Sequence, residues 1–182
     1  MSAQLAEISA LTSKAPTRVR ELRASGVTGF KMDVPAEGAA VKHQLFADSI
    51  VSGGANPMGL GGWLWREGDV AFMEVQLGKA FEGAPGRAHG GIVAALIDET
   101  MGLVLAINEV LAFTVQLDIT YRAPTPVNKP IICQATLAKR EGRKLFIDAK
   151  AVDGETLIAT ATSIFVAVDP TQFLAHVPTT DS

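Results

Sequence analysis

The sequence predicts an α+β domain in which one long central helix is wrapped by an antiparallel β-sheet. Residues 89–108 form a run that is apolar nearly all round, and such a helix has to be buried. Two β-rich segments precede this run and four follow it, most of them joined by tight turns. Because hairpins build antiparallel sheets, a single sheet curved around the helix would bury it.

Composition limits the classes of function. The chain has 182 residues, 48% of them hydrophobic, which suits one domain with an appendage and a substantial core. A net charge of −3 offers no basic surface for nucleic acid or an anionic membrane. Cys133 is the single cysteine, so an intrachain disulfide and a cysteine metal cluster are excluded, and the three histidines lack metal-ligand spacing. We expect no metal, no signal peptide and no membrane span, and therefore a cytoplasmic protein.

The chain divides into three parts. Residues 1–55 are predicted to be an N-terminal helical extension, with one short helix between Thr17 and Gly26 and a second from about Glu37 to Gly53. The second pattern places Ile50 among its apolar residues. Residues 56–170 hold the central helix and the strands, and residues 171–182 are predicted to be a C-terminal tail.

The strands are predicted from alternation and turn chemistry. Segments 63–66 and 70–77 flank a Glu-Gly-Asp turn, and a Gly- and Pro-containing loop then leads to the helix. Segment 113–122 follows the helix with a clean period-two alternation. Segments 129–140, 144–152 and 156–168 are joined by turns at Gly142 and Gly154.

The helix carries groups that indicate hydrolytic chemistry. Burying Asp98 or Glu99 costs several kcal/mol unless the carboxylate is paired, so each acid is either compensated or used. Gly90 and Gly91 offer bare N–H groups at the helix N-terminus, where the dipole favours negative charge. An oxyanion site combined with an acid that activates water is typical of a hydrolase. A structural interpretation is open for each group: helix polar residues, a capping His89, and glycines that allow close packing.

The spacing of these groups predicts a shared site. Asp98 lies nine residues after His89, which is roughly 13 Å along a helix axis. General-base chemistry needs contacts of about 3 Å. The two groups are too far apart on one helix to reach the same carbon atom. We therefore expect a homodimer in which two antiparallel helices each contribute to both active sites.

Five features of residues 60–170 occur together: EGAPGRAHGG at 82–91, the acid Asp98, LDITYRAP at 117–124, EGRK at 141–144 and ATSIF at 161–165. With these features the segment resembles the hotdog-fold acyl-CoA thioesterases of the phenylacetyl-CoA-thioesterase type. It looks most like the branch that contains the human mitochondrial thioesterase-superfamily members.

The resemblance implies a role for each site residue. The Gly90 N–H, alone or with that of Gly91, would polarise the thioester carbonyl, and His89 would help to shape this oxyanion hole. Asp98 of the other subunit would act as general base or as nucleophile, and the Thr114 hydroxyl would orient the water. Many relatives carry an asparagine six residues before the histidine, where this chain has Gly83.

The expected activity is hydrolysis of an acyl-CoA to the free acid and coenzyme A, with a role in fatty-acid metabolism. We expect no cofactor beyond the coenzyme A of the substrate, and a homodimer or a tetramer of two dimers. Some of Ile92, Leu96, Met101 and Leu105 would line the acyl group. Six basic residues would surround the coenzyme A phosphates: Arg87, Arg122, Lys139, Arg140, Arg143 and Lys144. The alternative is that they are solvated charges at turns and strand ends.

Two alternatives remain open. A hotdog hydratase or dehydratase would need a histidine paired with an acid, and only His89 lies near enough to serve. A non-catalytic hotdog module would bind acyl-CoA as a sensor or assembly partner without turning it over.

Overall fold

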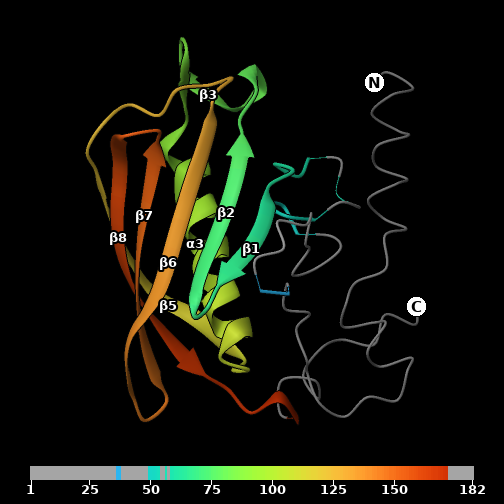
Figure 1. Cartoon of the computed structure of the whole chain (residues 1–182), viewed down its shortest axis with the longest axis vertical. Coiled ribbons are helices and arrows are strands. Elements are labelled where there is room, and N and C mark those ends of the chain that lie inside the picture. Colours follow the sequence, from blue (N-terminus) through green and yellow to red (C-terminus); the bar gives the residue numbers. More distant parts are fainter. Residues whose placement is uncertain (1–35, 38–48, 54–55, 57, 172–182) are drawn as a thin grey trace.

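A six-stranded antiparallel sheet curves around one long helix in the computed structural model of this chain (Figure 1). The structure describes residues 36–37, 49–53, 56 and 58–171. The order of the strands in the sheet is β1-β2-β6-β7-β8-β5, so β1 and β5 form its two edges. The predicted α+β architecture is confirmed. Most of the N-terminal extension and the C-terminal tail lie outside the described residues, and the three-part division of the chain stays a prediction.

The strands agree with the predicted segments to within a residue or two. The helix α3 spans Gly90–Ile107, with His89 as its N-cap and Asn108 as its C-cap. The strands are β1 Trp63–Glu67, β2 Val70–Gln76, β5 Ala112–Tyr121, β6 Pro130–Glu141, β7 Lys144–Asp153 and β8 Thr156–Ala167.

The segment predicted to be a loop before α3 contains short elements of its own. A 3₁₀ helix, η1, spans Lys79–Phe81, and β3 Glu82–Ala84 pairs with β4 Arg87–Ala88. The turn between the two strands has Pro85 at its second position and Gly86, with φ of 72°, at its third. This is the chemistry of a type II turn, which a proline and a glycine specify together.

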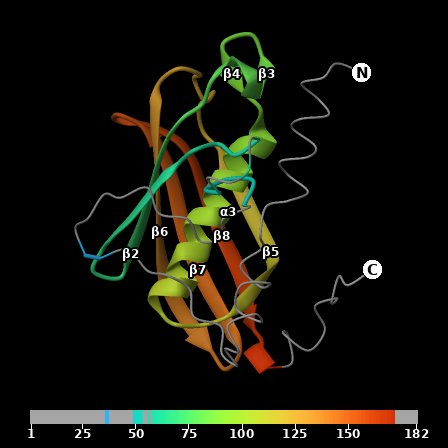
Figure 2. The same cartoon turned by 90° about the vertical axis from the view of Figure 1, so that its right-hand side faces the viewer.

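The core lies between α3 and the concave face of the sheet (Figure 2). Side chains of the helix that are fully buried include Leu96, Ile97, Met101, Leu103 and Val104. They pack against inward-facing residues of the strands, among them Leu64, Met73, Ile131, Leu145, Ile147 and Ile158.

By length and composition alone, α3 could cross a membrane, which differs from the expectation that no segment could. Half of its 18 residues are buried inside the structure. The apolar character of α3 follows from its place at the centre of the core, where a helix is covered on several sides.

A β-bulge interrupts the clean alternation predicted for 113–122. Leu117 pairs with Ser163 and Thr114 pairs with Phe165, so Val115 is an extra residue on β5. Strict alternation from Leu117 would place Thr114 on the outer face of the sheet, but the extra residue turns it to the inner face. The prediction of an unbroken period of two is therefore wrong at this position.

A short turn at 49–53 crosses the helix on the side away from the sheet (Figure 2). The Gly53 N–H donates to the Ser49 carbonyl at 3.1 Å, and Val51 and Ser52 are buried. Ile50 is exposed rather than on a buried helix face, and Glu37 forms an isolated parallel bridge with Arg66. The rest of both predicted helices lies outside the described residues.

Candidate active site

One backbone donor is free at the start of α3. The His89 carbonyl accepts from the Ile92 and Val93 N–H groups, as expected for an N-cap. The His89 Nδ1 accepts from the Gly91 N–H at 3.0 Å. Among the described residues, the Gly90 N–H has no hydrogen-bond partner. Of the two glycine donors considered from the sequence, only Gly90 is therefore available to a ligand.

His89 is fixed by close packing against the β3 strand. Its N–H donates to the Phe81 carbonyl at 2.8 Å. A Cβ added at Gly83 would lie 2.9 Å from the His89 Cα, which is too close for any side chain. The position that carries asparagine in many relatives must therefore be glycine here, unless His89 shifts. Because its Nδ1 is already an acceptor for the helix cap, this histidine suits the oxyanion end better than the acid–base role of a hydratase.

Tyr121 reaches the same end of α3 from β5. Its hydroxyl donates to the Gly90 carbonyl at 2.7 Å. Tyr121 lies within the LDITYRAP motif at 117–124, but the sequence predicts no role for it. Its position at the end of segment 113–122, where a tyrosine hydroxyl can reach a neighbouring element, is the signal that could have identified it.

Asp98 and Thr114 are brought together within one chain. The Thr114 Oγ1 donates to the Asp98 Oδ1 at 2.9 Å, a contact that the bulge on β5 makes possible. Asp98 is half-buried and Thr114 is exposed, so the pair is open to solvent. Since α3 is unbroken from Gly90, Asp98 lies about 12 Å along the axis from the free N–H. The two functional ends remain apart in a single chain.

Glu99 has a different set of partners. The hydroxyls of Ser49 and Ser52 both donate to its Oε1, with the Ser49 contact at 3.0 Å. Ser52 is fully buried. Glu99 thus fastens the 49–53 turn to α3, which is the structural role left open for it by the sequence.

The six basic residues lie at two ends of the chain. Arg87 on β4 and Arg122 after β5 are exposed at the end that holds the start of α3. The other four lie on the β6–β7 hairpin at the opposite end: Lys139, Arg140, Arg143 and Lys144.

The hairpin residues have partners of their own. The Lys139 Nζ lies 2.9 Å from the Glu141 carboxylate and 4.3 Å from the centre of the Phe146 ring. The Nε atoms of Arg140 and Arg143 donate to the carbonyls of Gly142 and Ala167. One chain therefore does not bring all six basic residues to one rim.

The residues expected along the acyl chain have mixed positions. Leu96, Met101 and Leu105 are buried and belong to the hydrophobic core. Ile92 is only partly buried and stays a candidate. No group of three or more metal-binding side chains occurs among the residues that the structure describes.

The comparisons with known proteins agree with this architecture. Residues 85–160 match the model of the family described as Thioesterase superfamily. The acyl-coenzyme A thioesterase THEM4 of Mus musculus is 41% identical over 97 residues, which cover 52% of this chain and 42% of the mouse protein. The chain thus spans less than half the length of that relative.

Two solved structures show the fold. The thioesterase superfamily protein RHA08564 has a TM-score of 0.65 at 20% identity, covering 91% of this chain and 79% of that one. The Streptococcus mutans UA159 protein smu.793, solved with acetyl CoA bound, has a TM-score of 0.55 at 19% identity, covering 58% of this chain and 86% of that one. The hotdog fold and the resemblance to the thioesterase superfamily are therefore confirmed.

Proposed function

We propose that this hotdog domain, similar in sequence and fold to the thioesterase superfamily, is an acyl-CoA thioesterase that works as a homodimer with shared active sites. The observation that carries the proposal is the separation of two complementary groups along α3. A single unpaired N–H stands at its first turn, and a carboxylate held by a hydroxyl stands two turns later. The acyl-coenzyme A thioesterase name of the mouse relative and the acetyl CoA bound to the Streptococcus mutans protein support this choice of substrate.

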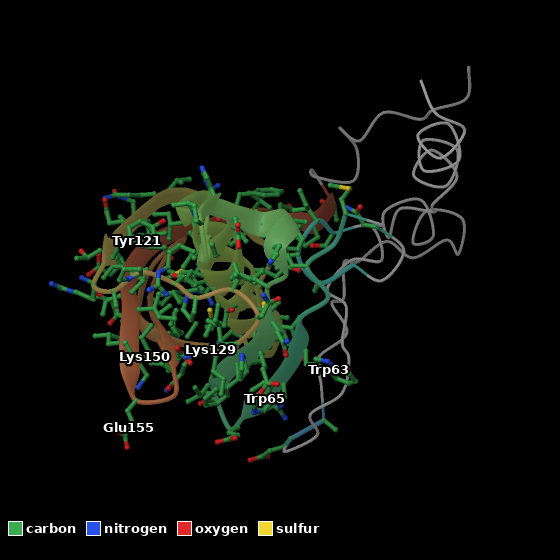
Figure 3. The ribbon with its side chains drawn as sticks, turned by 90° about the horizontal axis from the view of Figure 1, so that it is seen from above. Trp63, Trp65, Tyr121, Lys129, Lys150 and Glu155 are labelled. Carbon is green, nitrogen blue, oxygen red and sulfur yellow. The ribbon has the colours of Figure 1, made fainter. Side chains whose placement is uncertain are left out.

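The free edge of β5 supports the dimer. β5 pairs with β8 on one side, and no described strand pairs with the other. Phe113, Val115 and Tyr121 on this strand are 47%, 61% and 49% exposed. A long apolar edge strand is a template for pairing with another chain. Figure 3 shows Tyr121 at this side of the molecule, away from Trp63 and Trp65 on the opposite edge strand β1.

A two-fold pairing of β5 strands brings the separated groups together. In such an interface the same edge meets itself, so the two strands run antiparallel and the two α3 helices point in opposite directions. The start of one helix then approaches the middle of the other. Gly90 of one subunit and Asp98 of the partner subunit would face one thioester, and the partner's basic hairpin would approach Arg87 and Arg122.

Hydrolysis follows from the chemistry of these groups. The Gly90 N–H and the helix dipole polarise the thioester carbonyl. Asp98 of the partner subunit, oriented by its Thr114 hydroxyl, accepts a proton from a water as the oxygen attacks the carbonyl carbon. The tetrahedral intermediate places its negative oxygen against the Gly90 N–H. It then collapses by breaking the C–S bond, and the leaving sulfur takes the proton from Asp98.

The test is release of free thiol from short, long and aromatic acyl-CoAs. Asp98→Asn should lower kcat by roughly 10²–10⁴-fold, the usual contribution of a general base, with the fold intact. Asp118→Asn is the matched control because Asp118 lies on the outer face of the same strand as Thr114, where Gln116 donates to it at 2.6 Å. This control should keep the wild-type rate.

Three results would contradict the proposal. Near wild-type turnover by Asp98→Asn would remove the acid from the mechanism. Saturable acyl-CoA binding without thiol release would favour the binding module, and water addition to an enoyl-CoA would favour the hydratase. The cytoplasmic location, the role in fatty-acid metabolism and the independence from any cofactor stay predictions from the sequence.

A further inference from the structure

We infer that Tyr121 is a positioning residue that, together with His89, clamps the Gly90–Gly91 peptide and thereby aims the free Gly90 N–H at the substrate carbonyl. The inference rests on the proposed function. The peptide unit between the two glycines is held at both ends. Its carbonyl accepts from the Tyr121 hydroxyl at 2.7 Å, and its N–H donates to the His89 Nδ1 at 3.0 Å.

A clamp is needed because of where the glycines stand. The first turn of a helix has N–H groups without intrahelical acceptors, so fewer hydrogen bonds hold its backbone. Two successive glycines add the largest conformational freedom available to a chain. The direction of the Gly90 N–H depends on the orientation of the next peptide plane, since Gly90 contributes to both. Fixing the Gly90–Gly91 plane from two sides therefore fixes the donor that lies just before it.

The packing around the two glycines is matched to the clamp. A Cβ at Gly91 would lie 3.1 Å from the His89 Nδ1, a contact tighter than most real ones. A Cβ at Gly90 would lie 3.4 Å from the Tyr121 hydroxyl oxygen. Both clamping side chains thus lie directly over the backbone that they hold. The missing Cβ provides needed space at Gly91, whereas a Cβ at Gly90 would make an ordinary van der Waals contact with Tyr121.

Tyr121 also joins this donor to the dimer edge. It is the last residue of β5, the strand that carries Thr114 and whose free edge we propose as the interface. Pairing of two β5 strands would hold the Tyr121 ring in place from the opposite side. The strand β5, which forms the proposed interface, would then also position the Gly90 N–H that polarises the carbonyl.

The experiment compares Tyr121→Phe with wild type in steady-state hydrolysis of acyl-CoA. This change removes the hydroxyl and keeps the ring, so the fold and the interface should be preserved. We expect kcat to fall roughly 3–10-fold, the effect of one net hydrogen bond, with KM unchanged. His89→Ala should lower kcat similarly, and His89→Asn, which supplies a cap acceptor, should restore part of the loss. Because both side chains hold one peptide, the two losses should not add in the Tyr121→Phe and His89→Ala double variant.

A spectroscopic measurement separates this inference from the proposed function. The substrate is an acyl-CoA with ¹³C in its thioester carbonyl, bound to the Asp98→Asn protein so that turnover is slow. A donor aimed at the carbonyl lowers its infrared stretching frequency, and adding Tyr121→Phe should return the band toward its position for free acyl-CoA. The band reports the donor whether the protein hydrolyses acyl-CoA or only binds it.

The outcomes are then distinct. If Tyr121→Phe returns the carbonyl band toward its free position and also reduces kcat, the clamp is supported. If the band returns in this way but the protein shows no turnover, the clamp is supported and the thioesterase proposal fails. An unchanged band or an unchanged kcat in an active enzyme overturns the clamp and leaves the proposed function intact. A fall in kcat matched by an equal loss of thermal stability, without a band shift, would also overturn it in favour of a structural tyrosine.

Discussion

Asp98 and Glu99 are consecutive acids on one helix, and their surroundings differ. Asp98 faces β5, where one exposed threonine hydroxyl contacts it at the open edge of the sheet. Glu99 lies about 100° further around the helix. There, two serine hydroxyls of the 49–53 turn contact it, one of them fully buried.

The difference shows how the same chemical group serves two purposes. A carboxylate oxygen that accepts from two hydroxyls of the same turn is a structural anchor, because both hydrogen bonds hold that turn to the helix. A carboxylate with a single partner, next to an apolar strand edge, keeps oxygen lone pairs available for a water. The roles of consecutive acids in an apolar helix therefore depend on which hydrogen-bond donors the neighbouring elements place beside each carboxylate.

Beyond the effect of Asp98→Asn, the largest effect is expected from removing the free N–H at Gly90. Gly90→Pro removes the free N–H, and proline is tolerated at the first helical position after an extended residue such as His89, with φ of −65° and ψ of 135°. We expect Gly90→Pro to lower kcat by roughly 10²–10³-fold, the usual effect of losing an oxyanion donor. Gly90→Ala keeps the N–H and is the control.

A mixed dimer then tests whether the site is shared. Subunits with Asp98→Asn and with Gly90→Pro are co-expressed with different tags and purified as a heterodimer. One of its two sites combines the intact halves of both chains, so about half of the wild-type rate should return. A heterodimer as inactive as its parents would show that each site lies within one chain, and would remove the main argument for a shared interface.

The next effect is on stability. Glu99→Ala leaves the buried Ser52 hydroxyl without its acceptor, and we expect it to lower the free energy of unfolding by about 1–3 kcal/mol. Glu99→Gln keeps an acceptor oxygen and should cost less. Denaturant unfolding measures both, with Asp98→Ala as the comparison. That change should alter stability little while lowering kcat as strongly as Asp98→Asn does. Equal stability losses at the two acids would erase the proposed difference between them.

A smaller effect on rate is expected at Thr114. Thr114→Val keeps the shape of the side chain and removes the hydroxyl that donates to Asp98. Loss of a hydrogen bond to a charged group should lower kcat roughly 10-fold. Thr114→Ser retains a hydroxyl and should stay near wild type in the same thiol-release assay. Unchanged activity in the valine variant would mean that Asp98 is oriented without it.

The smallest effect is a labelling signal from Cys133. Burial raises the pKa of its thiol from 9.0 to about 12, against a lowering by the Thr100 hydroxyl. Because the folded pKa is the higher one, this thiol stabilises the fold fully below pH 9, and the contribution is lost as pH rises toward 12. At pH 8 the native thiol should react with a maleimide only when the core opens. Glu99→Ala should speed that reaction and Asp98→Asn should not.

Much of the fold could be predicted because the controlling signals are local. The helix is apolar all round, and glycine turns separate the later strands, so α3 and the six strands of the sheet lie close to their predicted positions. The hairpin β3–β4 was missed because two- and three-residue strands carry too little alternation to detect. The loss of alternation at Val115 was missed because a bulge is set by pairing with β8, which lies more than forty residues away in sequence.

The sequence by itself determined that a glycine-flanked helix start and a central acid lie on one buried helix, about two turns apart. That separation is a property of the α-helix, and it is the basis of the proposed shared site. Only the tertiary structure decided the partners: the bulge that turns Thr114 toward Asp98, the serines that occupy Glu99, and the Tyr121 hydroxyl on the Gly90 carbonyl. These contacts join elements distant along the chain, so no local pattern encodes them, and packing alone selects which polar groups meet.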